Sequence, residues 1–139
     1  MSTLHVDIVS AEKALYSGEA TLVIAPAIEG EVGIMPKHTP LLTPLRAGEV
    51  RLRIPDEETE MSIYVSGGML EVQPHMVTIL SDTAIRAKDL DEQKILKAQQ
   101  EAQEMLSSNN TDIDFAQARA ELTAAAAQLA LLRKLKRNA

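Results

Sequence analysis

The distribution of glycine and proline constrains this sequence more than any other feature. All six glycines and all six prolines fall within the first 74 residues. Both residue types interrupt regular elements and favour turns, so they predict many short strands in the first part of the chain. The later part is rich in Ala, Gln, Glu, Lys and Leu, which favour helices. We therefore expect a β domain over residues 1–86 and a helical domain over residues 87–139.

Short aliphatic segments make up the expected strands. Three segments alternate between apolar and polar side chains, as strands with one buried face do, and three are more continuously apolar and should lie deeper. The alternating segments are residues 4–8, 50–54 and 69–72, and the apolar ones are residues 22–24, 63–65 and 76–80. Turn residues such as Ser17-Gly18 and Gly67-Gly68 separate them at even spacing. This arrangement favours an antiparallel sandwich or a flattened barrel.

Residues 35–44 contain three prolines, at positions 36, 40 and 44. Each proline fixes its own φ and restricts the residue before it, so we expect a stiff extended loop here and not a central strand. The loop either serves only as a rigid crossover between two sheets or also presents Lys37 and His38 to a partner.

Apolar residues in the helical part recur at alternating steps of three and four, which places them along one stripe of a helix. The first run is Ile95, Ala98, Ala102 and Met105, and the second is Phe115, Ala118, Leu122, Ala125, Leu129 and Leu132. A polar connection, Ser107-Ser108-Asn109-Asn110, separates the runs and predicts an antiparallel helical hairpin. Asp89 with Glu92, and Thr111 with Asp114, form the capping patterns that predict the two helix starts.

The expected seam between the two helices is mostly alanine. A buried alanine methyl contributes only about 0.8 kcal/mol, where a buried leucine contributes about 1.5–3 kcal/mol. Because Ala124–Ala127 has high helix propensity, the second helix can stay helical after it leaves its partner. The pattern therefore fits a hairpin that opens, and it equally fits a permanent two-helix cap.

Charge and composition exclude several classes of function. The net charge of −6 argues against nucleic acid as the main partner. The absence of cysteine excludes disulfides and thiolate sites, and the spacing of His5, His38 and His75 fits no metal motif. No phosphate-binding glycine loop or nucleophile signature occurs. With no signal peptide or membrane-spanning run, we expect a soluble intracellular protein with a mechanical or regulatory role.

The acidic chain ends in a basic segment that contains Arg133, Lys134, Lys136 and Arg137. Cations at a helix C-terminus compensate the helix dipole, which is one explanation. Four cations in five residues exceed that need, so the alternative is a patch for an acidic protein partner or an anionic membrane.

Three segments resemble the ε subunit of bacterial F-type ATP synthases. They are Glu29-Gly-Glu-Val-Gly-Ile-Met-Pro-Lys-His-Thr-Pro-Leu-Leu-Thr43, Ile63-Tyr-Val-Ser-Gly-Gly-Met-Leu-Glu-Val-Gln-Pro74 and Asp82-Thr-Ala-Ile-Arg86. The similarity spans the whole chain, including the alanine-rich hairpin. The resemblance implies a ten-stranded β-sandwich followed by a two-helix hairpin, in a non-catalytic subunit of the rotating central stalk.

The resemblance also implies partners. The sandwich would bind the γ subunit and rest on the membrane c-ring, with Glu29, Glu31 and His38 in the ring-facing loop. The hairpin would have a folded form and an extended form, and the extended form would enter the α/β catalytic hexamer and block ATP hydrolysis. The protein would then be peripheral on the cytoplasmic face of the bacterial inner membrane, and would meet the membrane only through the complex.

Contacts of the hairpin follow from the same resemblance. Ser108 matches a family position that approaches the β subunit, and the four basic residues near the C-terminus would pair with the acidic C-terminal region of that subunit. Some members of the family bind ATP through a motif that matches Leu90 to Ile95 here, with Asp91, Lys94 and Arg119 as the candidate contacts. Lys94 stands where those members have arginine and cannot supply its planar fork, so we expect no bound cofactor. An ATP-sensing module and a purely structural stalk adaptor remain the alternatives.

Overall fold

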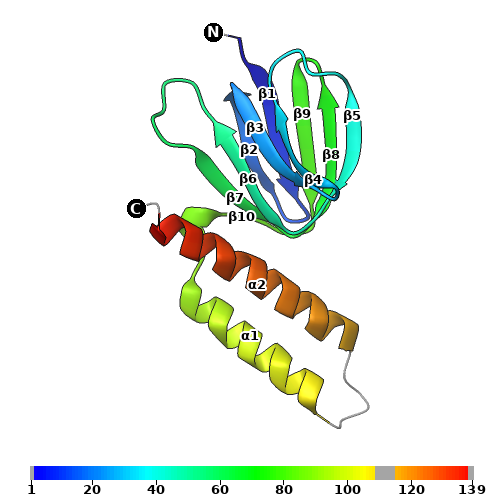
Figure 1. Cartoon of the computed structure of the whole chain (residues 1–139), viewed down its shortest axis with the longest axis vertical. Helices are drawn as coiled ribbons and strands as arrows, with labels where there is room; N and C mark the ends of the chain where they lie inside the picture. Colours follow the sequence, from blue (N-terminus) through cyan, green and yellow to red (C-terminus); the bar gives the residue numbers. More distant parts are fainter. Residues whose placement is uncertain (1, 109–114, 138–139) are drawn as a thin grey trace. The chain divides into compact units, whose positions relative to one another are not determined.

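The computed structural model describes residues 2–108 and 115–137 (Figure 1). The chain divides into two compact units, Met1–Lys88 and Asp89–Ala139. The break after Lys88 lies close to the expected boundary at residue 86. The first unit consists of strands and the second of helices.

The first unit contains ten strands, which confirms the expected sandwich. They are β1 (Leu4–Ser10), β2 (Ala14–Ala20), β3 (Leu22–Ala27), β4 (Gly30–Ile34), β5 (Leu41–Leu45), β6 (Gly48–Arg53), β7 (Met61–Val65), β8 (Gly68–Gln73), β9 (Met76–Ser81) and β10 (Ala84–Arg86). Their order is β10-β7-β6-β3-β5-β8-β9-β1-β2, with β4 paired to β3.

The strands fold over into two layers between β3 and β5. These two strands share only the pair Ala27 and Leu45, so the sheet turns sharply there. Alternate residues from both layers fill the space between them, as period-two patterning requires. The core is aliphatic and includes Val6, Ile8, Val23, Val50, Leu52, Ile63, Leu70 and Ile79, all fully buried.

One pairing differs from the expected antiparallel arrangement. β1 and β9 are parallel, in register from His5 opposite Met76 to Ser10 opposite Ser81. The other pairings among the described strands are antiparallel. The alternation of residues 4–8 fixes which side of β1 is buried. It does not indicate whether β9, which comes much later in the chain, runs parallel or antiparallel to β1.

The proline-rich segment was only partly predicted. Residues 36–40 form the expected loop, but Leu41–Leu45 forms β5, which pairs with β8 along its whole length. The carbonyl of Pro44 accepts a hydrogen bond from the N–H of Ile28 at 3.0 Å. The backbone of Pro44 therefore faces away from β8, and the missing N–H removes no hydrogen bond from that ladder.

The second unit contains helices α1 (Glu92–Ser107) and α2 (Phe115–Arg137), preceded by a 3-10 turn at Ala87–Asp89. The expected start of the first helix at Asp89 is wrong, because Asp91 is the N-cap. Its Oδ1 accepts hydrogen bonds from the N–H groups of Gln93 and Lys94 at 3.0 and 3.3 Å. The second capping pattern, Thr111 with Asp114, lies outside the described residues.

Candidate functional site

The two helices pack together along a seam that combines alanines with larger aliphatic residues. Ile95, Ala125 and Leu129 form a buried cluster, against which Leu90 and Leu132 pack. Of the other expected seam residues, Ala102 and Ala118 are buried and Leu122 is partly buried. The predicted antiparallel hairpin and most of its apolar stripe are confirmed.

Three residues were wrongly placed in the seam. Ala98, Met105 and Phe115 are exposed, and in α1 the partly buried positions are instead Gln99 and Leu106. A helix with 3.6 residues per turn has neighbours on the same face at both three and four residues, so Ala102 is compatible with either set. The face of α1 that packs in the seam runs through Ile95, Gln99, Ala102 and Leu106, at steps of four, three and four residues.

An ion pair joins the two ends of the hairpin. Lys136 Nζ, in the last turn of α2, lies 2.7 Å from Glu92 Oε2 in the first turn of α1. Both side chains remain largely exposed, so the pair contributes only about 0.2–1 kcal/mol and is sensitive to salt. Lys136 is therefore engaged within the folded hairpin.

The other expected contacts of the hairpin lie on its surface. Arg133 and Arg137 are exposed, and Lys134 is partly buried. Ser108 is the C-cap of α1, and its N–H donates to the carbonyl of Met105 at 3.3 Å. The basic residues thus gather in the last turns of α2.

The candidate ATP contacts are not assembled into a site. The carboxylate of Asp91 caps α1, and Lys94 and Arg119 are exposed on different helices. Among the described residues, no hydrogen bond or ion pair joins the side chains of these three residues.

The expected ring-facing residues fall into two places. Glu29 lies in the turn between β3 and β4 and Glu31 one residue into β4, and both are exposed. His38 follows the other end of β4, where its Nδ1 lies 2.6 Å from the carbonyl oxygen of Thr39. Since β4 has five residues and is roughly 17 Å long, the structure does not bring His38 together with the two glutamates.

A polar cluster that we did not predict lies on the outer face of β1 and β2. His5 Nε2 is 3.0 Å from Asp7 Oδ1, and Ser17 Oγ is 2.7 Å from the same carboxylate oxygen and 3.2 Å from His5 Nε2. The hydrogen bond from Ser17 and the contacts with His5 hold the pKa of Asp7 below its ordinary value, against the opposing effect of burial. In a catalytic triad the carboxylate binds Nδ1 and leaves Nε2 for the serine, so this cluster is not one.

An apolar row crosses the outer face of the second layer, and sequence reasoning missed it. Pro44 on β5 is opposite Met69 on β8, Met69 is opposite Leu80 on β9, and Leu80 is opposite Val9 on β1. Met69 and Leu80 are 37% and 52% exposed. The sequence pattern that could have revealed this row is that Met69 and Leu80, both apolar, occupy positions of their strands where the alternation places side chains toward solvent.

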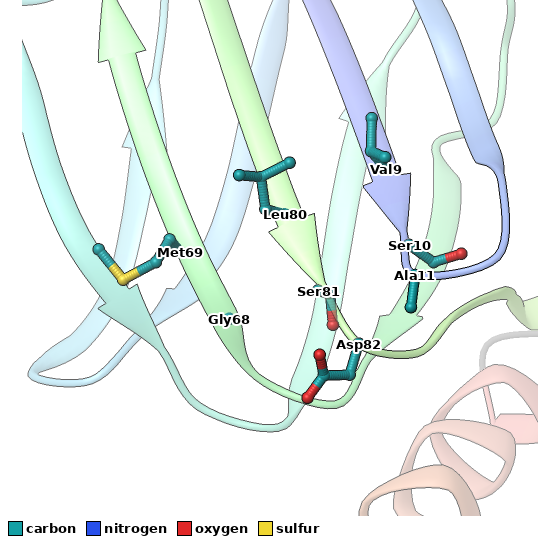
Figure 2. A pocket seen from close by; sticks show the side chains of 8 residues that line it. All are labelled: Val9, Ser10, Ala11, Gly68, Met69, Leu80, Ser81 and Asp82. Carbon is teal, nitrogen blue, oxygen red and sulfur yellow. The ribbon is translucent and has the colours of Figure 1, made fainter.

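A hollow of about 280 Å³ lies beside this row. It is lined by Val9, Met69, Leu80 and residues of the adjoining turns, whose side chains are drawn in Figure 2. Gly68 forms part of the lining, with φ of +124°. A Cβ on Gly68 would lie 1.9 Å from the carbonyl oxygen of Leu80, so only glycine fits there. Ser81, which is buried, donates from Oγ to the carbonyl of Thr83 at 2.9 Å and holds the turn that borders the hollow.

Residues 2–108 and 115–137 contain no group of three His, Asp or Glu side chains placed to hold a metal ion. Neither helix carries a stretch that is long and apolar enough to cross a bilayer.

Comparison with known proteins identifies both units. The family described as "ATP synthase, Delta/Epsilon chain, beta-sandwich domain" matches residues 3–87, and its "long alpha-helix domain" matches residues 88–132. The ATP synthase epsilon chain of Nitrosomonas eutropha is 56% identical over 134 residues, which cover 96% of this chain and 95% of the relative. That of Alkalilimnicola ehrlichii is 55% identical over 139 residues, which cover 100% of this chain and 99% of the relative.

A solved structure also shares the fold. A chain of the Euglena gracilis mitochondrial ATP synthase, in a structure of its OSCP, F1 and c-ring parts, aligns with a TM-score of 0.80 over 95% of this chain and 82% of that chain. At 19% identity this likeness describes the fold alone. The family matches and the near-complete alignment with the bacterial chains place the sequence: this chain belongs to the ATP synthase delta/epsilon family.

Proposed function

We propose that this chain is a non-catalytic rotor subunit of an F-type ATP synthase, which couples the γ subunit to the c-ring and inhibits ATP hydrolysis through its helical hairpin. The observation that carries this proposal is the division into two compact units, of which the second is held together by a seam where three of the five buried expected residues are alanines. Such a hairpin can open without unfolding the sandwich.

The seam supports an opening hairpin on energetic grounds. Of the expected seam residues, five are buried, and three of these are alanines, each contributing about 0.8 kcal/mol by burial. The exposed ion pair between Lys136 and Glu92 adds little. A partner that binds the open form more tightly than the folded form by a few kcal/mol then shifts the population.

The apolar row supports a permanent protein partner for the sandwich, and we assign it to the γ subunit. Exposed apolar side chains that gather in one place mark interaction sites more often than scattered ones do. Met69, Leu80 and Val9 are neighbours across three strands, and Leu42, also exposed, lies on the same face of β5 as Pro44. A rigid sheet presents these side chains without any rearrangement on binding.

The turn at Glu29 and the first residues of β4 supply a separate polar surface, which we assign to the c-ring. Glu29 and Glu31 are exposed there. With the γ subunit on one surface and the c-ring on another, the sandwich transmits rotation between them. The subunit then lies on the cytoplasmic face of the bacterial membrane, attached through the complex.

The basic end of α2 supports the inhibitory contact. Arg133, Lys134, Lys136 and Arg137 lie within the last five residues of α2 and would complement an acidic segment of the β subunit once the hairpin extends. Ser108, at the turn between the helices, is a second contact. The ATP-sensing alternative has less support, because the Asp91 carboxylate already caps α1.

ATP hydrolysis by the assembled complex tests the proposal. Three chains are compared: the whole chain, one ending at Lys88 and one ending at Leu132. We expect hydrolysis to rise on removal of the hairpin, with proton pumping preserved, and to rise also when only the basic end is removed. Unchanged hydrolysis in both truncated complexes would leave the hairpin as a structural cap, and loss of pumping would mean that the sandwich alone cannot couple.

A further inference from the structure

The outer face of β6 carries an arginine that is surrounded by carboxylates. Arg51 lies between Val50 and Leu52, which are fully buried, so its side chain points outward. Its NH2 nitrogen is 3.3 and 3.5 Å from the two carboxylate oxygens of Glu31, while Nε is 3.8 Å from Glu49 and NH1 is 3.9 Å from Glu60. We call these four residues the Arg51 cluster.

The pairing of the strands explains how Arg51 reaches Glu31 across β3. Ile24 on β3 is opposite Arg51 on one side and opposite Gly33 on the other. Gly33 has no side chain, and a Cβ there would meet only a methyl group of Leu22, at 4.0 Å. The aliphatic part of Arg51 can therefore lie over Ile24 and extend its guanidinium to Glu31, two residues before the glycine.

Arg51 is the more fixed member of the pair. Its side chain is 25% exposed, whereas that of Glu31 is 51% exposed. Arg51 also contacts two further carboxylates, while its guanidinium is the only ion-pair partner of Glu31 among the described residues. An exposed glutamate on an edge strand has several rotamers of similar energy, so the guanidinium decides which one is populated.

We propose that Arg51 is a positioning residue for Glu31: it holds the carboxylate in one orientation before the partner at the β4 turn binds. This inference rests on the proposed function, which assigns that turn to the c-ring. A partner that meets an ordered carboxylate loses less side-chain entropy on binding, so its affinity is higher.

The chain offers a matched control. Arg53, two residues along the same strand, also faces outward and contacts Glu60 at 3.5 Å, but it has no contact with Glu31. Replacing Arg53 with alanine removes the same charge from the same face. Any effect specific to Arg51 is then separable from a general change of surface charge.

The test measures binding of F1 complexes carrying variant chains to membrane vesicles stripped of F1 and containing the c-ring. We expect Arg51→Ala and Glu31→Gln each to weaken binding by about 2- to 10-fold, and Arg53→Ala to leave it unchanged. Arg51→Ala should have no further effect in the Glu31→Gln background. Arg51→Lys keeps the charge without the planar fork and should give an intermediate loss.

A second readout follows Glu31 directly in the isolated whole chain. Side-chain coupling constants from NMR should show one dominant rotamer of Glu31 in the natural chain and in Arg53→Ala, and averaged rotamers in Arg51→Ala. Thermal unfolding of each variant checks that the sandwich is intact.

The outcomes distinguish the positioning role of Arg51 from the assignment of the β4 turn to the c-ring. If Glu31→Gln weakens binding but Arg51→Ala does not, or if their effects add, the positioning role is overturned and the ring-facing turn stands. If Glu31→Gln leaves binding unchanged, the assignment of this turn to the c-ring fails, and the role of Arg51 in binding fails with it.

Discussion

Replacement of Leu129 by alanine should open the hairpin and leave the sandwich folded. Leu129 is 4% exposed and lies in the buried cluster with Ile95 and Ala125. A buried Leu→Ala change in a protein core destabilises by about 2–5 kcal/mol, and we expect the lower end because this cluster is small and near the surface. A loss of about 2 kcal/mol lowers the ratio of folded to open hairpin by roughly 30-fold.

Hydrogen exchange of backbone amides measures this change, because each unit supplies its own signal. Amides of α1 should exchange roughly 30-fold faster in Leu129→Ala, while those of β6 and β8 should keep their rates. Leu96→Ala is the matched control, since Leu96 is 44% exposed on α1 and its loss should change stability by less than about 0.5 kcal/mol. Unchanged α1 exchange, or an equal rise in the sandwich strands, would refute the idea of a separately opening hairpin.

Three further changes test other features of the structure. Replacing Glu92 by glutamine should destabilise the folded hairpin by about 0.2–1 kcal/mol in low salt and by less in high salt, as measured by hydrogen exchange. The same replacement in a chain that already carries Lys136→Met should cause no further destabilisation. Gly68→Ala should destabilise the sandwich by more than about 2 kcal/mol in urea unfolding, because of its backbone conformation and the close carbonyl. Ser17→Ala should raise the pKa of Asp7 toward 3.8 in a carboxyl NMR titration. Because folding lowers that pKa, the stability linked to Asp7 is present above pH 3.8 and is lost as the pH falls through the folded-state pKa. The Ser17→Ala variant should therefore lose less stability on acidification than the natural chain.

Much of the fold could be predicted from local patterns. Alternation located β1, β6 and β8, and the helical stripe located both helices and most of their seam. Strand β2 was missed because Ser17-Gly18 has the composition of a turn, although Gly18 lies opposite Val6 within the β1–β2 pairing. At this position the pairing of β2 with β1 outweighs the local preference of Ser17-Gly18 for a turn.

The candidate site was less predictable, because it depends on contacts between residues far apart in sequence. Nothing in the sequence places Arg51 beside Glu31 or Met69 beside Leu80, since those contacts follow from strand register. The seam of α1 was misassigned at Ala98 because the two possible helical faces differ by one residue. The proline-rich segment was misread at its end, because the effect of Pro44 depends on which side of β5 carries a partner.

The parallel pairing of β1 with β9 has a consequence for how the protein is made. Residues 4–10 are synthesised before the other nine strands, yet one of their two neighbours in the sheet, residues 76–81, is synthesised last but one among the strands. Contacts of such long sequence separation slow folding, whereas the hairpin of α1 and α2 relies on local contacts. During synthesis the edge of β1 that pairs with β9 therefore stays unpaired until residues 76–81 have been made. An unpaired strand edge can pair with another chain, so the incomplete sandwich is prone to aggregate during that interval.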